Sequence, residues 1–326
     1  MLRQGGESGP LIWGGGGESV VRASPPTKCR ILARPKVTGR NPTRCSSVAK
    51  VAANHRDGTT RTSGESPPSP AAQHGRLWEI DALRTLAIVL MVVYHAAYDV
   101  NLLTPSIGID PYNGIWRAVQ VVCGSLFLGI VGVSFWVSHA RAASHGLRGL
   151  ALWSAHARRG LQVLAAAALV SVATRVALGA DDAVRFGILH LIGVLLLMVL
   201  PAAVRFGPWN VLLGIAVVAV GVAMDVTSDA PGALVLGFVP TENGVDWYPL
   251  LPWAGAALIG LSVGSVLYPD GHRGAVLRAL PVASQRGTRF GAAGRRSLLI
   301  YLVHQPILVA SIALALTVAG IDLQPS

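Results

Sequence analysis

The apolar residues of this chain are gathered into long runs. From residue 83 onwards, runs of about 17 to 22 apolar residues recur, which is the length that crosses roughly 30 Å of bilayer hydrocarbon as an α-helix. Only 13% of the 326 residues are charged, against about 25% in ordinary soluble proteins. The sequence therefore predicts an all-α polytopic membrane helix bundle.

We expect about seven transmembrane helices, and the loops between them indicate an orientation. The expected spans are residues 83–103, 116–137, 159–178, 186–204, 209–226, 248–268 and 298–318. Arginine gathers in the loops after the second, fourth and sixth spans, whereas the other loops carry mainly acidic residues. Because cytoplasmic loops are enriched in arginine, we predict a cytoplasmic N-terminus and an outside C-terminus in a multi-pass protein of the cell membrane.

Residues 1–75 differ from the rest of the chain. They are rich in Gly, Ser, Pro and basic residues and lack apolar periodicity and a signal-peptide core. We interpret them as a disordered basic tail, or as upstream sequence translated from a start codon assigned too early. Residues 76–326 are then the transmembrane domain.

The formal net charge of +11 does not require a nucleic-acid partner. The cytoplasmic excess of arginine that membrane topology demands accounts for it, so no nucleic acid is expected. The three cysteines form no metal-binding or disulfide pattern. We therefore expect no metal, and the lipid bilayer is the first partner.

Three polar residues interrupt the first apolar segment, WEIDALRTLAIVLMVVYHAAYDVNLL. An ionisable residue inside the bilayer is costly, so Arg84, His95 and Asp99 are candidates for function. Eleven residues make about three helical turns, which places Arg84 and His95 on one helix face about 16 Å apart. Asp99 follows one turn later, where it could hold one imidazole nitrogen and leave the other as a general base.

Two more histidines fall inside expected spans. His190 lies near the outer end of the fourth span, and His304 lies about 10 Å above the inner face in the last. With His95 between them, they could form a ladder across the membrane. That ladder would suit a proton path or a divided acyl-transfer site, and three unrelated polar contacts between helices would produce the same pattern.

Arginines precede or open the helices that start at the cytoplasmic face. The free N–H groups of a helix start, together with arginine, make a good seat for phosphate. The candidates for such a ligand are Arg84, Arg158, Arg159, Arg295 and Arg296. Membrane topology alone would also place arginines there.

The outer segment DWYPLLPWAGAALIG contains Asp246, Tyr248 and Trp253. Its aromatic residues fit an interfacial belt, and its prolines fit a helix start. The alternative is an aromatic wall for a sugar-like acceptor, on which Asp246 would bind hydroxyl or amine groups.

Five segments in order resemble the bacterial members of the heparan-alpha-glucosaminide N-acetyltransferase catalytic domain family. They are WEIDALRTLAIVLMVVYHAAYD, SLFLGIVGVSF, FGILHLIG, DWYPLLPWAG and GRRSLLIYLVHQP. The spacing of Arg84 and His95 also resembles that of the acyltransferase-3 group of membrane enzymes. The resemblance implies a catalytic His95, and acyl-CoA bound from the cytoplasm near Arg84. Asp99, His190 and His304 follow by position, and Thr85 departs from the family's usual glycine.

These observations predict a membrane acyltransferase that moves an acetyl group from acetyl-CoA to an amine or hydroxyl of a cell-envelope sugar or glycan. A proton-coupled transporter that uses the histidines as a relay is one alternative, although no inverted repeat is visible. A non-catalytic membrane scaffold is the other.

Overall fold

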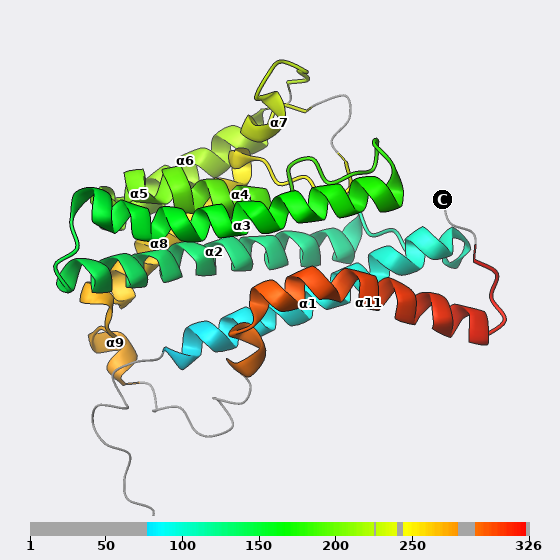
Figure 1. Cartoon of the computed structure of the whole chain (residues 1–326), viewed down its shortest axis with the longest axis horizontal. Helices are drawn as coiled ribbons and strands as arrows, with labels where there is room; N and C mark the ends of the chain where they lie inside the picture. The colour runs from blue at the N-terminus through cyan, green and yellow to red at the C-terminus, as the bar shows by residue number, and fades with distance from the viewer. Residues whose placement is uncertain (1–76, 225, 240–243, 280–290, 324–326) are drawn as a thin grey trace, which may run out of the picture. The chain divides into compact units, whose positions relative to one another are not determined.

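The computed structural model describes residues 77–224, 226–239, 244–279 and 291–323, all of them within the unit Pro67–Ser326. The tail predicted for residues 1–75 lies outside the described residues. The described part is helical, as predicted, and its only extended pairing is an isolated bridge between Thr227 and Val239. Figure 1 shows the helices and their labels.

Five long helices carry most of the described chain. They are α1 (Trp78–Leu103), α2 (Gly114–Ser144), α3 (Gly149–Leu178), α8 (Leu250–Leu267) and α11 (Ser297–Val318). The shorter helices are α4 (Ile188–Val194), α5 (Leu200–Ala203), α6 (Asn210–Ala223), α7 (Ala233–Leu236) and α9 (Ala275–Arg278). A π-helical stretch, Leu195–Val199, joins α4 to α5, and 3₁₀ turns cover Pro105–Ile107, Val204–Trp209 and Pro269–Gly271.

Six helical segments of the described chain are long and apolar enough to cross a membrane. The expected count of about seven is not confirmed, because Ile188–Ala223 forms one run of 36 residues where the sequence predicts two spans. This run is not straight. Gly207 leaves the helical conformation, with φ 52° and ψ −126°, directly before Pro208.

Contacts with α8 give the direction of α6. The Ser262 hydroxyl, late in α8, donates to the Pro208 carbonyl at 2.7 Å. At the other end of α6, Gly221 lies against Pro252, early in α8. Helix α6 therefore runs antiparallel to α8. Its 14 residues span about 21 Å, which is short for a separate membrane span.

Small residues let α2 and α8 approach closely. A methyl group on Gly132 would collide with the backbone of Ala257 and Leu261, and one on Gly260 would collide with Gly129. Close backbone contact of this kind is a common way for helices to associate in membranes, where burial from water supplies no driving force. Helix α8 packs in the same way against α6, where Gly214 meets Gly255. These contacts build the central part of the bundle.

Ion pairing fixes the start of α1. Arg273, in the loop after α8, donates to both carboxylate oxygens of Glu79, at 3.0 and 2.6 Å. The Tyr268 hydroxyl donates to the same carboxylate at 3.1 Å. Helix α1 therefore begins at Trp78, five residues before the predicted span, with its first charges paired.

Helices α1 and α11 lie side by side (Figure 1). None of the 22 residues of α11 is fully buried. Polar contacts therefore contribute much of the interaction that holds α11 against α1. At its start, the Gly294 amide donates to the Thr85 hydroxyl at 3.0 Å. Further along, the Gln305 amide donates to the Asp99 carboxylate at 2.6 Å. These two contacts set the register of α11 against α1.

Candidate active site

His95 on α1 and His304 on α11 form the centre of the candidate site. Their rings meet edge to face, with centroids 4.9 Å apart. Each ring uses Nδ1 to contact a carbonyl of its own helix: His95 contacts Met91 at 2.9 Å, and His304 contacts Tyr301 at 2.6 Å. Because a carbonyl only accepts hydrogen bonds, each Nδ1 carries the proton. In the neutral rings, each Nε2 is then a free acceptor.

The Nε2 atom of His304 is buried and has no hydrogen-bond partner among the described residues. Buried polar atoms are normally paired, so an unpaired one deserves an explanation. A ligand with an N–H or O–H group would satisfy it. The pair therefore offers a nitrogen base to whatever binds between α1 and α11.

The predicted hydrogen bond between Asp99 and His95 is wrong. Asp99 is fully buried and accepts from Gln305, while its second oxygen has no hydrogen-bond partner within the part of the chain that the structure describes. The imidazole of His95 instead reaches back to Met91, because side chains on a helix lean towards its N-terminus. Asp99 thus holds α11 rather than the ring.

The predicted histidine ladder is also wrong, since His95 and His304 lie at the same level. The predicted depth of His304 takes residue 298, the start of the expected span, as the inner face. In the structure, Gly294 already lies against the backbone of α1 between Asp81 and Arg84. Counted from there, His304 is ten residues along its segment and His95 is eleven residues beyond Arg84, which gives nearly equal depths.

His190 is placed apart, at the start of α4. Its Nδ1 accepts from the Gly187 amide at 3.3 Å, and its Nε2 lies 3.5 Å from the Ser171 hydroxyl. Both ring nitrogens are therefore engaged in shaping the turn before α4. His190 also shares with Asp246 and Tyr301 a narrow packing gap that has no room for a water molecule.

Asp246 is held in a fixed position beside this gap. Its carboxylate accepts from the Ile188 amide at 3.2 Å and from the Tyr301 hydroxyl. A side chain at Gly187 would collide with the carboxylate. Burial raises the pKa of Asp246 from 3.8 to about 6, although both hydrogen bonds act to lower it.

Tyr248 and Trp253 pack against each other, with ring centroids 4.6 Å apart. Tyr248 is buried and lies over Gly124 of α2, where a methyl group would meet both rings. The pKa of Tyr248 is raised well above its usual value, mainly by burial and secondly by the negative charge of Asp246. Tyr94 and Cys123 also lie within electrostatic reach of Tyr248. Tyr248 is therefore buried near Asp246, and Trp253 is half-buried beside it.

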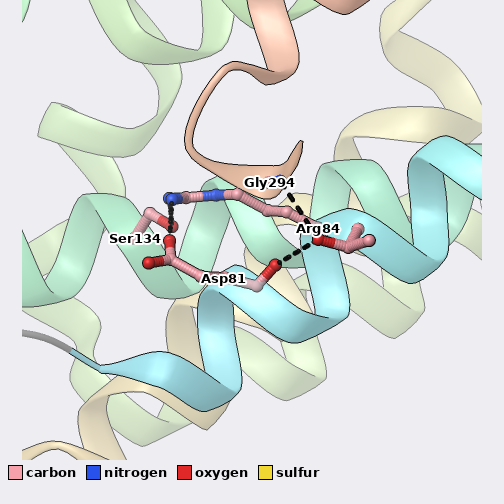
Figure 2. Close-up of polar contacts among 5 residues, drawn as sticks. Asp81, Arg84, Ser134 and Gly294 are labelled. Carbon is pink, nitrogen blue, oxygen red and sulfur yellow. Dashed lines mark hydrogen bonds and ion pairs between the residues drawn. The ribbon is translucent and has the colours of Figure 1, made fainter. Parts of the chain in front are cut away.

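Arg84 lies at the predicted cytoplasmic end of the same helix face as His95. It donates to Ser134 of α2 at 2.6 Å and to Asp81 at 3.2 Å. Figure 2 shows these contacts beside Gly294, in the segment before α11 that lies against α1. Thr85, at the position of the family's usual glycine, accepts the Gly294 amide. The threonine that replaces the usual glycine thus links α1 to the segment before α11 through a hydrogen bond.

The other predicted arginines divide into two groups. Arg159 is exposed and lies within electrostatic reach of Arg84. Arg295 and Arg296 directly precede α11 and are also exposed, and the Arg295 guanidinium lies near Gly291 beside Asp81. Arg158 is exposed too, and no contact places it beside Arg84.

Of the five predicted arginines, only Arg295 and Arg296 directly precede the start of a long helix. Helix α3 begins at Gly149, so Arg158 and Arg159 lie nine and ten residues inside it, where the backbone N–H groups are already bonded. Arg84 likewise lies six residues after the start of α1. The segment before α11 packs against α1 and brings Arg295 near Asp81 and Arg84, while Arg159 of α3 lies only within electrostatic reach of Arg84.

Sequence reasoning did not identify Tyr301, Gln305 or Ser134 as parts of this site. Tyr301 and Gln305 flank His304 in the YLVHQP segment, so the repeat of polar residues on one face of an apolar helix was the available signal. Ser134 carried no such signal, because a lone serine in a membrane helix is common. Among the described residues, no group of three or more His, Cys, Asp or Glu side chains gathers as metal ligands do.

Comparison with known proteins identifies a family. The family model described as "Heparan-alpha-glucosaminide N-acetyltransferase, catalytic" matches residues 76–306. The match covers the described helices from α1 to the first half of α11, and with them every candidate site residue. The comparisons with curated proteins and with solved structures found no match.

Proposed function

The chain belongs to the heparan-alpha-glucosaminide N-acetyltransferase catalytic family, and on that premise we propose that it transfers an acetyl group from acetyl-CoA to an amine or hydroxyl of a cell-envelope sugar or glycan. The observation that carries the proposal is the state of His95. Its Nδ1 is tied to Met91, so its Nε2 is free to act as a base beside His304. A fixed tautomer is what a general base needs.

The end of the site that carries Arg84, Arg159 and Arg295, here called the arginine end, suits the phosphates of acetyl-CoA. Arg159 and Arg295 are exposed, and Arg84 lies next to them in a half-buried position. Arginine forms strong, charge-assisted hydrogen bonds with phosphate oxygens. His95 lies about 16 Å further along α1, a distance that the extended pantetheine arm of the donor would cross. The thioester would then reach the histidine pair.

The chemistry follows from this placement. The acceptor nitrogen or oxygen attacks the thioester carbonyl, and His95 Nε2 takes the proton that the nucleophile loses. The carbon–sulfur bond then breaks, and the CoA thiolate receives that proton from the imidazolium. The products are the acetylated acceptor, CoA and a neutral His95. A positioned general base of this kind contributes roughly 10² to 10⁴ in rate.

The acceptor would bind on the side of Asp246, Tyr248 and Trp253. A carboxylate accepts hydrogen bonds from sugar hydroxyls and from amines. An aromatic pair offers an apolar surface to the face of a sugar ring, with a hydroxyl at one edge. We assign Asp246 to recognition of the acceptor and His304 Nε2 to a hydrogen bond with the group that attacks.

Binding of acetyl-CoA to purified protein tests the donor side. Arg159→Ala should weaken binding roughly tenfold, the effect of losing a hydrogen bond to a charged group. The matched control is Arg175→Ala, an exposed arginine in the last turn of the same helix, which should leave affinity unchanged. Equal affinities for both variants would exclude the arginine end as the donor site. Acetyl transfer to methyl α-D-glucosaminide then tests the reaction itself.

A further inference from the structure

One residue touches both parts of the candidate site. Tyr301 lies one helical turn before His304 on α11, and its ring packs against the His304 ring with centroids 5.5 Å apart. Its hydroxyl donates to the Asp246 carboxylate in the loop before α8. Tyr301 therefore connects the histidine pair to the carboxylate that we assign to the acceptor.

The surroundings of this hydrogen bond show that the carboxylate is held in one place. The Ile188 amide donates to Asp246 from the start of α4, and Gly187 leaves the space that the carboxylate occupies. Tyr301 supplies the donor from the opposite element, α11. Because α11 has no fully buried residue, this bond also contributes to its position near α4 and α8.

We propose that Tyr301 is a positioning residue for acetyl transfer. Its hydroxyl fixes the Asp246 carboxylate, and its ring keeps His304 against His95. An acceptor held at Asp246 then presents its nucleophile to the histidine pair at a constant distance. This inference rests on the proposed function, which supplies the acceptor.

Three variants separate this role from a general structural one. Tyr301→Phe keeps the ring against His304 and removes the hydroxyl. Gly187→Ala adds a methyl group that displaces Asp246 and leaves Tyr301 intact; the φ of −84° at Gly187 suits alanine. The matched control is Tyr98→Phe. It removes the hydroxyl of a tyrosine near the end of α1, which forms a hydrogen bond with Tyr112 in the loop before α2.

Kinetics with acetyl-CoA and methyl α-D-glucosaminide give the first readout. Tyr301→Phe and Gly187→Ala should lower kcat/KM for the glucosaminide roughly tenfold to a hundredfold, with KM for acetyl-CoA unchanged. Tyr98→Phe should match the wild type. Loss of the tyrosine donor also raises the pKa of Asp246, so the acidic limb of the pH profile should move to higher pH in Tyr301→Phe. Wild-type kinetics and an unmoved limb in Tyr301→Phe would overturn the proposal.

A stability cycle gives a second readout that needs no activity. Tyr301→Phe, Asp246→Ala and the double variant are unfolded thermally in the same detergent. The effects should be non-additive, because either single change breaks the same hydrogen bond. Additive effects would show that the bond is absent and would overturn the inference. If the wild type does not acetylate the glucosaminide, the proposed function fails, and this cycle still decides whether Tyr301 positions Asp246.

Discussion

His95 and His304 meet edge to face with ring centroids 4.9 Å apart, and each ties its Nδ1 to a carbonyl of its own helix. The pair depends on the register of α11 against α1. Two polar contacts flank it along that interface, Gly294 with Thr85 on one side and Gln305 with Asp99 on the other. The site is therefore an interface between two helices that are far apart in sequence.

Replacement of His304 by phenylalanine separates packing from chemistry. His304→Phe keeps a ring against His95 and removes the unpaired Nε2. We expect kcat/KM for the acceptor to fall roughly tenfold or more, the effect of losing one hydrogen bond to the reacting group. The melting temperature should stay near that of the wild type. Full acetyl-transfer activity in this variant would limit His304 to packing.

The bond between Asp99 and Gln305 should act on the site through α11. Asp99→Ala and Gln305→Ala each remove it, and each should lower both stability and kcat. Hydrogen bonds between membrane helices contribute about 0.6 kcal/mol on average, and up to about 2 kcal/mol. The double variant should lose little more than either single variant. Thermal unfolding of the three variants measures this, and fully additive losses would contradict a shared bond.

Asp246 predicts a pH dependence with a defined sign. Burial raises its pKa from 3.8 to about 6, so the carboxylate is ionised above about pH 6 and neutral below it. If the ionised form binds the acceptor, kcat/KM should rise with pH through about 6. Asp246→Asn should remove that part of the pH profile. A profile that is identical in wild type and Asp246→Asn would exclude the carboxylate from recognition.

The same pKa shift links Asp246 to stability. The folded protein holds the proton more tightly than the unfolded chain does, so the stabilisation from this group is complete below about pH 4. It is lost as pH rises from about 4 to about 6. The decrease should be absent in Asp246→Asn. Thermal unfolding across this pH range, at constant salt, checks the direction.

Much of the fold could be predicted from the sequence, because apolar runs of membrane length report helices directly. The residues at which those helices begin and end could not be predicted in this way. The predicted span begins at residue 83, whereas α1 begins at Trp78 and includes Glu79, whose carboxylate pairs with Arg273 across 194 residues. The predicted depth of His304 and the predicted place of Arg158 and Arg159 at a helix start are wrong for the same reason, because both helical segments begin earlier than the apolar runs indicate.

The site was predictable only within single helices. Helical periodicity predicts Arg84 and His95 on one face of a helix, and both residues lie in the single helix α1. Partners from other helices carry no local signal, so the bonds of Asp99 to Gln305 and of Asp246 to Tyr301 were not predicted. The pairing of His95 with His304 required the register of α1 against α11, which depends on Gly294 and Thr85.

The most direct measurement is acetyl transfer from radiolabelled acetyl-CoA by purified protein in lipid nanodiscs, comparing wild type, His95→Ala and the control Tyr98→Phe. The account predicts transfer to methyl α-D-glucosaminide by the wild type and by Tyr98→Phe. It predicts a rate at least about a hundredfold lower for His95→Ala, with acetyl-CoA still bound. Undiminished transfer by His95→Ala, with the protein folded and the donor bound, would contradict the central claim that His95 is the base.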